Sequence, residues 1–176
     1  MDLESRMKHA IRDVPDFPKP GIIFKDITTV LSDPQLCIDI SRALYDYWAT
    51  KRIDGVVGIE SRGFFFGMQL AQLLNVPFIP VRKVGKLPYA TVSHKYELEY
   101  GSAEIELHTD AIKPNSRILV HDDLLATGGT ADAAAALIMK CNGVVAGYSF
   151  LVALDFLNGR NILIKRTSDI QSLVHY

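Results

Sequence analysis

The sequence predicts an α/β fold in which a parallel sheet carries helices on both faces. Several short runs are apolar throughout, as in strands buried on both sides of a parallel sheet, and they alternate with segments of helical periodicity. A length of 176 residues, with 48% hydrophobic and 22% charged residues, suits a single domain with a full core. One segment in the middle of the chain alternates polar and apolar residues instead, which predicts a hairpin added to the sheet.

Composition limits the partners that the protein can have. A net charge of -1 provides no broad positive field for nucleic acid. The two cysteines, Cys37 and Cys141, have neither the number for a disulfide framework nor the spacing of a zinc site. The first residues have no apolar signal core, and the run Val144–Leu154 is shorter than the roughly 20 residues that span a bilayer. We therefore expect a cytoplasmic protein that binds no nucleic acid and no membrane.

The N-terminal region has its own pattern. Apolar residues every four positions from Leu3 to Ile11 predict a short amphipathic helix. Residues 13–21 hold three prolines, each with a fixed φ and no N–H, so we expect them to be irregular. A short extended run, IIFKDIT, follows at 22–28, and Ser-Asp-Pro at 32–34 is typical of a helix start.

The remaining core elements follow from the apolar runs. Helices are expected at 64–74 and 130–141, the second ending at Asn142-Gly143, and a turn is expected at 113–116. Buried strands are expected at 53–60, 78–81, 117–123 and 144–154, with a fifth at 161–164 near the edge.

The segment between the second and third of these strands predicts an exposed hairpin. Residues 92–100 and 103–108 each alternate apolar with polar side chains around a Gly101-Ser102 turn. Because this hairpin lies between two core strands, it forms a flap attached to the sheet. The basic stretch VRKVGKLP at 81–88 leads into it.

Residues 119–130, LVHDDLLATGGT, are more typical of binding than of packing. In open α/β sheets ligands bind beyond the carboxyl ends of strands, where loops lead into helices. Backbone N–H groups of 126–130, together with the positive end of the helix dipole, suit a phosphate, and Asp122 and Asp123 suit sugar hydroxyls. Neither GxxxxGK[ST] nor GxGxxG occurs. The alternative is a tight turn with two solvated aspartates.

This stretch resembles the phosphoribosyl-pyrophosphate signature of type I phosphoribosyltransferases. The segments FPKPGIIFKDIT, GIESRGFFFG, RKVGKLP and YELEYG together resemble the adenine phosphoribosyltransferases, in order and over nearly the whole chain. The resemblance implies one phosphoribosyltransferase domain over 1–176, with a type I phosphoribosyltransferase-like parallel sheet flanked by helices. It also implies an N-terminal adenine-binding hood at 12–30 and a flexible β-hairpin flap at 82–108.

The resemblance further implies transfer of the 5-phosphoribosyl group from 5-phosphoribosyl 1-pyrophosphate to adenine, giving AMP and pyrophosphate in purine salvage. Mg²⁺ would be the cofactor, held mainly through pyrophosphate and ribose rather than by a protein metal site. A homodimer is also implied.

Site residues follow from the same resemblance. Ala126, Thr127, Gly128, Gly129 and Thr130 would bind the 5′-phosphate, and Asp122 and Asp123 the 2′ and 3′ hydroxyls. Arg62 would act in catalysis and meet pyrophosphate with Arg82, Lys83 and Lys86. The last three could instead form an ordinary solvated loop.

The adenine pocket is implied only by the resemblance. Phe24 would cover one face of the base, with Leu124 near the other, while Ile23 and Lys25 would bind the purine edge through main-chain groups. Lys25 replaces an expected arginine, and the alternative for Phe24 is a core aromatic in a short strand. Glu99 would assist proton movement at the ring nitrogens, although the sequence barely separates it from Glu97 and Glu104. His121 is expected on the side of its strand away from ligand and has no assigned role.

Two other functions remain possible from the sequence. One is a phosphoribosyltransferase for another base, such as guanine, xanthine or orotate. The other is a nucleotide-sensing regulator, which would need the phosphate loop but neither the basic stretch nor a flap that carries glutamate.

Overall fold

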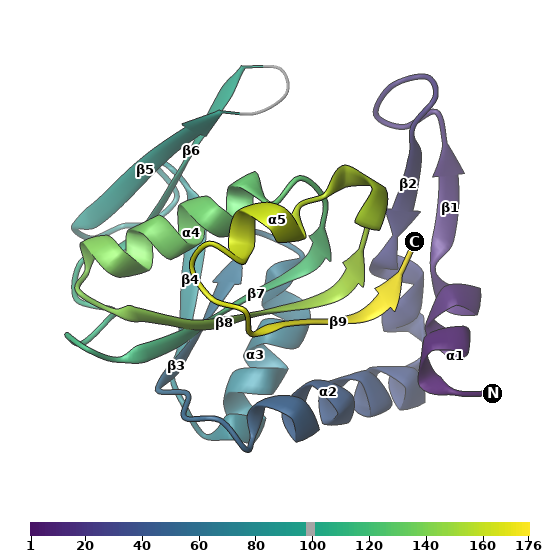
Figure 1. The fold of residues 1–176 in the computed structure, drawn as a ribbon, viewed down its shortest axis with the longest axis horizontal. Coiled ribbons are helices and arrows are strands. Elements are labelled where there is room, and N and C mark those ends of the chain that lie inside the picture. Colours follow the sequence, from purple (N-terminus) through teal and green to yellow (C-terminus); the bar gives the residue numbers. More distant parts are fainter. Residues whose placement is uncertain (98–100) are drawn as a thin grey trace. The chain divides into compact units, whose positions relative to one another are not determined.

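The computed structural model describes residues 1–97 and 101–176, and the chain divides into two compact units, Met1–Leu44 and Tyr45–Tyr176. Figure 1 shows the helices and strands of both units. Helix α2, Pro34–Trp48, begins in the first unit and ends in the second. Among the described residues, no helix has both the length and the apolar character needed to cross a bilayer.

The first unit contains the short elements expected near the N-terminus. Asp2 caps the first helix by accepting a hydrogen bond from the Ser5 amide at 2.8 Å, and Asp33 caps α2 by accepting one from the Leu36 amide at 3.0 Å. Both caps confirm the helix starts predicted from the sequence. The elements are α1 (Leu3–Ala10), β1 (Arg12–Pro15), β2 (Ile23–Asp26), the 3-10 helix η1 (Ile27–Ser32) and the start of α2.

The proline-rich stretch is less irregular than expected. Residues 13–15 belong to β1, which pairs antiparallel with β2, so that Val14 lies opposite Phe24. The expectation of an irregular 13–21 was therefore wrong for its first three residues. Pro15 is tolerated because it is the last residue of a strand in a two-stranded sheet, where a missing N–H removes little pairing.

The second unit is built on a sheet that has seven strands among the described residues, in the order β5-β6-β4-β3-β7-β8-β9. The five strands from β4 to β9 in that order are parallel, and β6 pairs antiparallel with both β4 and β5. This confirms the predicted α/β fold. The strands are β3 (Gly55–Ile59), β4 (Phe78–Lys83), β5 (Thr91–Glu97), β6 (Ser102–His108), β7 (Arg117–Leu125), β8 (Val144–Ala153) and β9 (Ile170–His175).

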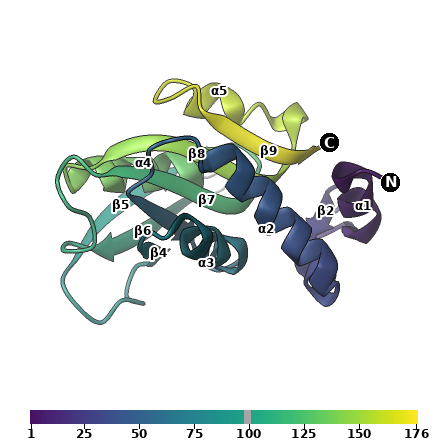
Figure 2. The ribbon, with the colours of Figure 1, turned by 90° about the horizontal axis from the view of Figure 1, so that it is seen from below.

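Helices cover both faces of this sheet, as the continuous apolar strands require. Figure 2 shows α3 (Gly63–Leu74) on one face, and α4 (Gly129–Lys140) and α5 (Arg160–Leu163) on the other. Val57, Val120, Phe150 and Leu137 are completely buried between the sheet and α4. The packing fixes where the loops that follow β3, β4 and β7 meet, which is where the candidate site lies.

The fifth core strand is not the one predicted. Residues 161–164 lie mostly in α5, and the edge strand is β9. Leu163 is buried, whereas Ile162 and Ile164 are exposed, so only one side of this run meets the core. Four apolar residues are too few to separate a strand from a helical turn by periodicity.

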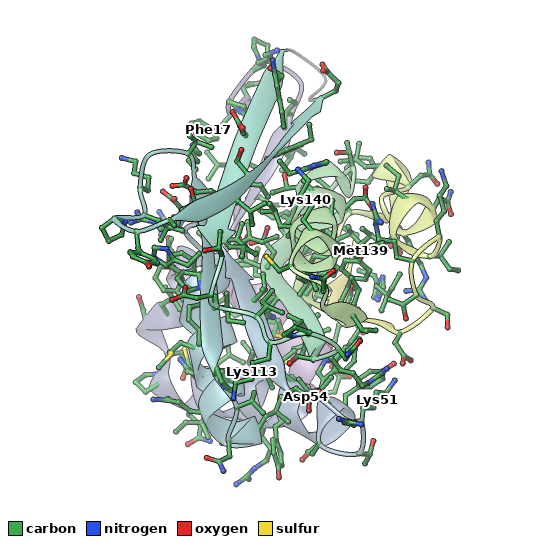
Figure 3. All side chains as sticks on the ribbon, turned by 90° about the vertical axis from the view of Figure 1, so that its left-hand side faces the viewer. Phe17, Lys51, Asp54, Lys113, Met139 and Lys140 are labelled. Carbon is green, nitrogen blue, oxygen red and sulfur yellow. The ribbon has the colours of Figure 1, made fainter. Side chains whose placement is uncertain are left out.

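The described parts of the predicted hairpin are β5 and β6, and β6 attaches the hairpin to the core sheet by pairing with β4. Ile105 and Leu107 of β6 are buried in the core. Strand β5 lies along α4: Lys140 Nζ donates to the Ser93 carbonyl at 2.6 Å (Figure 3), and the hydroxyls of Tyr96 and Thr130 are 3.2 Å apart. The hairpin is therefore attached to the helix that follows β7.

Candidate active site

The second unit brings most of the predicted site residues to the carboxyl ends of three adjacent parallel strands, β4, β3 and β7. Two cavities lie there and share one residue, Asp122. One, of about 70 Å³, is lined by Asp122, Leu124, Leu125, Ala126, Thr127, Gly128, Gly129, Thr130, Ala131 and Phe150. The other, of about 240 Å³, is lined by Glu60, Ser61, Arg62, Lys83, Asp122 and Asp123.

The smaller cavity is formed by the loop between β7 and α4, which we call the phosphate loop (126–130). Gly128 is the N-cap residue of α4, so the N–H groups of the first helical turn have no acceptor within the helix. These N–H groups and the helix dipole make the cavity favourable for an anion. The hydroxyl groups of Thr127 and Thr130 belong to the same lining.

The two glycines of this loop have different structural roles. Gly128 has φ +84, in the left-handed region, and a Cβ at this position would lie 2.7 Å from the Gly159 carbonyl oxygen. Gly129 is the first residue of α4, and its Cβ would meet nothing nearer than 3.7 Å. Only Gly128 is therefore required by both conformation and space.

The aspartate pair is held in a low-dielectric position. Asp123 is 3% exposed, and its Oδ2 lies 2.7 Å from Arg62 Nε, while Asp122 Oδ1 accepts from the Asp123 amide at 2.9 Å. Burial, followed by the neighbouring charge of Asp123, raises the pKa of Asp122 well above its usual value. Burial also raises the pKa of Asp123, against the opposing effect of Arg62.

These raised pKa values have a thermodynamic consequence. A carboxyl whose folded-state pKa is raised binds protons more tightly in the folded state, so stability falls as the pH rises from the ordinary aspartate pKa through the raised one. At neutral pH the pair therefore destabilises the unliganded fold. A ligand that supplies hydroxyl donors or positive charge would relieve this cost.

The larger cavity has carboxylates and cations together on its wall. Glu60 Oε2 accepts from Arg82 Nε at 3.2 Å and from the Lys83 amide at 3.0 Å. Burial would raise the pKa of Glu60, but these hydrogen bonds and the charge of Arg82 outweigh it and lower the pKa. The ionised Glu60 thus fixes the start of the basic stretch at the cavity.

A second carboxylate anchors the other part of the basic stretch. Glu106 is 4% exposed and accepts hydrogen bonds from the amides of Lys86 at 3.0 Å and Leu87 at 3.1 Å, and from Thr91 Oγ1 at 3.0 Å. Burial would raise its pKa, and the donors outweigh that effect and lower it. Although residue 106 is a polar position in the alternating pattern of the hairpin, its carboxylate turns inward to these amides.

The structure separates the four predicted pyrophosphate residues. Arg62 and Lys83 line the larger cavity. The Arg82 guanidinium instead contacts Glu60 and donates from Nη1 to the Lys86 carbonyl at 3.2 Å, and the Lys86 side chain is exposed. Arg82 and Lys86 therefore shape the basic stretch in this structure rather than line the cavity.

The predicted adenine residues are divided between the two units. Ile23, Phe24 and Lys25 lie on β2 in the first unit, and Leu124 lines the phosphate-loop cavity in the second. The Phe24 ring is only half-buried and meets Phe17 edge to face, with ring centroids 5.2 Å apart. Phe24 is therefore not a fully buried core aromatic.

The predicted proton-transfer residue, Glu99, lies outside the described residues. Of the two neighbouring carboxylates considered with it, Glu97 is exposed at the end of β5. Glu104 accepts from Ser93 Oγ at 2.6 Å across the hairpin, which is a structural contact.

His121, to which the sequence assigns no role, lies in the core. Its side chain is fully buried, Nδ1 lies 3.2 Å from Ser149 Oγ, and burial lowers its pKa to about 3. It is therefore neutral at physiological pH.

Sequence reasoning missed Glu60, Glu106 and Gly159. Glu60 is the last residue of the run 53–60 that predicts a strand, so its position at a strand end was the available signal. Glu106 has the period-two spacing of a solvent-facing residue, and Gly159 belongs to an Asn-Gly pair that predicts only a turn. Contacts between segments distant in the chain give these residues their place.

A bound divalent cation would find suitable donors here, although the described residues contain no cluster of three or more His, Cys, Asp or Glu side chains that could hold a metal by themselves. Asp122 offers a carboxylate at the junction of the two cavities. A hard cation that takes most of its ligands from phosphate and water suits this arrangement.

Comparison with known proteins gives a consistent result. A family model described as phosphoribosyl transferase domain matches residues 26–153. The adenine phosphoribosyltransferase of Cytophaga hutchinsonii is 52% identical over 99% of this chain and 96% of its own length. The crystal structure of adenine phosphoribosyltransferase from Rhodothermus marinus has a TM-score of 0.92 and 48% identity, covering 99% of this chain and 98% of that one. The Saccharomyces cerevisiae enzyme, complexed with D-2,5-dideoxy-2,5-imino-altritol 1,6-bisphosphate and adenine, has a TM-score of 0.89 and 38% identity, covering 97% and 98%.

Proposed function

Because this chain belongs to the phosphoribosyltransferase family and within it to the adenine phosphoribosyltransferases, we propose how its residues carry out that reaction. The protein transfers the 5-phosphoribosyl group from 5-phosphoribosyl 1-pyrophosphate to adenine, giving AMP and pyrophosphate in purine salvage. The observation that carries the proposal is the pair of cavities that meet at Asp122. A ribose at the junction would have a phosphate at one end and pyrophosphate at the other.

The phosphate loop binds the 5′-phosphate through main-chain N–H groups. Ala126, Thr127, Gly128, Gly129 and Thr130 supply the loop, and its N–H groups lie at the start of α4, where the helix dipole favours negative charge. The hydroxyls of Thr127 and Thr130 add donors. This part of the site therefore binds phosphate without a cationic side chain.

Asp122 and Asp123 accept hydrogen bonds from the ribose 2′ and 3′ hydroxyls. As pyrophosphate leaves, positive charge develops at C1 of the ribose. Two carboxylates already fixed near that point stabilise this charge without reorganising, which is electrostatic preorganisation.

Arg62 and Lys83 meet the leaving pyrophosphate, and the backbone of the turn at Ser61 contributes to the same wall. A guanidinium offers a fork of donors to phosphate oxygens, whereas lysine acts as a compact charge. Arg82 and Lys86 join the pyrophosphate contacts when the basic stretch closes on the ligand. Mg²⁺, when bound, would neutralise charge on the pyrophosphate oxygens, and the Asp122 carboxylate in the cavity wall is a donor that would help to hold it.

In the first unit, Phe24 would cover a face of adenine, and the main chain of Ile23 and Lys25 would bind the purine edge. In the second unit, Leu124 would contribute an apolar contact to the base. Glu99 assists proton movement at the ring nitrogens. Closure of the flap excludes water, because hydrolysis competes with attack by adenine.

We further propose a cytoplasmic homodimer. Phe65 and Met68, one turn apart on α3, are 41% and 44% exposed. Exposed apolar side chains clustered on one helix are typical of an association surface. Sedimentation analysis would test it, and a monomer at micromolar concentration would contradict it.

The function is tested by incubating the protein with the sugar donor, Mg²⁺ and one base at a time from adenine, guanine, xanthine and orotate. AMP should form with adenine at a much higher rate than any nucleotide from the other bases. Absence of AMP, or preference for another base, would contradict the proposal.

A further inference from the structure

The backbone of the turn after β8 is in close contact with the backbone of the phosphate loop. Gly159 lies between the 3-10 helix η2 (Asp155–Leu157) and α5. A Cβ placed on Gly159 would overlap the Ala126 carbonyl oxygen and lie 2.9 Å from both the Gly128 nitrogen and the Thr127 carbonyl carbon. The two backbones are therefore in direct contact, with no room for a side chain between them.

Conformation does not explain a glycine at this position. Gly159 has φ -58 and ψ -30, in the right-handed helical region that any residue adopts. The requirement is steric, and the three nearest atoms all belong to the phosphate loop. Conversely, a Cβ on Gly128 would meet the Gly159 carbonyl oxygen first.

Hydrogen bonds and an ion pair hold this turn in place. Asn158 adopts the left-handed conformation with φ 56, and its amide donates to the Asp155 carbonyl at 3.0 Å. Further along, the Arg166 guanidinium donates from Nε and Nη2 to the two oxygens of Asp132, at 2.5 and 3.1 Å. Because Asp132 lies in the first turn of α4, the segment 158–166 contacts both the phosphate loop and the helix that the loop enters.

From this geometry we infer that Gly159 is a positioning residue for the 5′-phosphate site, an inference that rests on the proposed function. Main-chain N–H groups cannot reorient by rotation as long side chains do, because the backbone conformation fixes their orientation. Close contact with Gly159 fixes the path of 126–128 and so the direction of the amides. Gly159 acts through the loop and does not touch the ligand.

The test compares Gly159→Ala with a matched control, Gly143→Ala. A Cβ on Gly143 would also be crowded, lying 2.8 Å from Ile138 Cγ2 and 2.9 Å from Ile112 Cγ2, but this glycine follows the opposite end of α4. Both variants therefore add one methyl group to a packed turn. Calorimetric titration with AMP and, separately, with adenine measures binding with and without the phosphate, and circular dichroism measures folding.

We expect Gly159→Ala to weaken AMP binding about tenfold or more, since displacements of an ångström carry effects of this size or larger. Adenine affinity should stay within about twofold of wild type, as should both affinities in Gly143→Ala. In steady-state assays, the KM for the sugar donor should rise more than kcat falls.

Unchanged AMP affinity in Gly159→Ala would overturn the inference, as would equal loss of AMP and adenine affinity. If Gly159→Ala does not fold, Asn158→Gly replaces it, because glycine accepts the left-handed conformation and only loosens the turn. That variant should weaken AMP binding more than adenine binding. Equal changes in the two affinities relative to wild type would again overturn the inference. Failure of the wild-type protein to bind AMP would instead contradict the proposed function.

Discussion

The two ends of the site bind negative charge in different ways. The phosphate loop uses main-chain N–H groups at the start of α4 and depends on close backbone packing against Gly159. The pyrophosphate end uses long cationic side chains on a stretch whose backbone amides are held by Glu60 and Glu106. Binding at the phosphate loop should therefore be sensitive to an added side-chain atom, and binding at the pyrophosphate end to the loss of a carboxylate.

This difference follows from what each end must do. The 5′-phosphate stays bound through the reaction, so a rigid cradle of fixed dipoles suits it. Pyrophosphate must be bound, stabilised and released, which suits side chains that can move. Carboxylates that hold only the backbone leave the cationic side chains free to reach the ligand.

Adding a methyl group to each glycine of the phosphate loop in turn tests whether this end of the site depends on close backbone packing. Gly128→Ala should weaken AMP binding about 100-fold, because the residue must keep a positive φ and its Cβ overlaps the Gly159 carbonyl. Gly129→Ala should change it by less than about threefold, since its Cβ meets only ordinary contacts. Titration of both variants with AMP checks this, and equal losses would contradict the different roles of the two glycines.

The flap should affect turnover rather than phosphate binding at either end. Glu99→Ala should lower kcat about 100-fold, the scale of a general acid–base group, without changing the affinity for AMP by more than a few fold. Glu97→Ala and Glu104→Ala are the matched controls on the same hairpin. Wild-type turnover in the Glu99 variant would remove this residue from the mechanism.

Glu106 tests the pyrophosphate end with a smaller effect. Glu106→Gln should raise the KM for pyrophosphate in the reverse reaction roughly tenfold, because a neutral amide accepts less strongly and brings an NH₂ towards the donors at Lys86 and Leu87. AMP affinity should not change. Glu104→Gln on the same strand is the control, and a loss of AMP affinity would show that the two ends are not separable.

The lowered pKa of Glu106 also predicts that acid reduces the stability of the fold. Its folded-state pKa is lowered, so its contribution to stability is present above the ordinary glutamate pKa and is lost as the pH falls through the lowered value.

His121 provides the smallest effect on activity, because it lies in neither region. Burial lowers its pKa from 6.5 to about 3, so stability is lost as the pH falls through that interval. His121→Leu should remove this loss, with denaturant unfolding at several pH values as the measurement. Activity at pH 7.5 should stay within about twofold of wild type. An unchanged pH dependence of unfolding would contradict the buried, neutral histidine.

The sequence predicts the phosphate loop well because the loop is local. Two aspartates, two threonines and Gly-Gly lie within nine residues of one another, between a strand and a helix. The parallel core and the hairpin are also predictable. A continuous apolar run indicates a strand buried on both faces, and an alternating run indicates a strand buried on one face.

What the sequence does not predict depends on contacts between distant segments. Glu60 reaches Arg82 and Lys83 because β3 pairs with β4. Glu106 reaches the basic stretch because β4 pairs with β6 and brings Arg82 opposite Glu106. The turn at Gly159 becomes part of the site only because the chain after β8 returns to the loop after β7. The apolar run 161–164 predicts a strand although it lies mostly in α5, because four residues are too few to distinguish strand from helical periodicity.

A crystal structure with AMP would show whether main-chain N–H groups of 126–130 bind the 5′-phosphate while Asp122 and Asp123 hold the ribose diol. We predict phosphate oxygens within hydrogen-bonding distance of those amides and both ribose hydroxyls on the aspartate pair. AMP bound with its phosphate elsewhere, and the loop without ligand, would contradict the account.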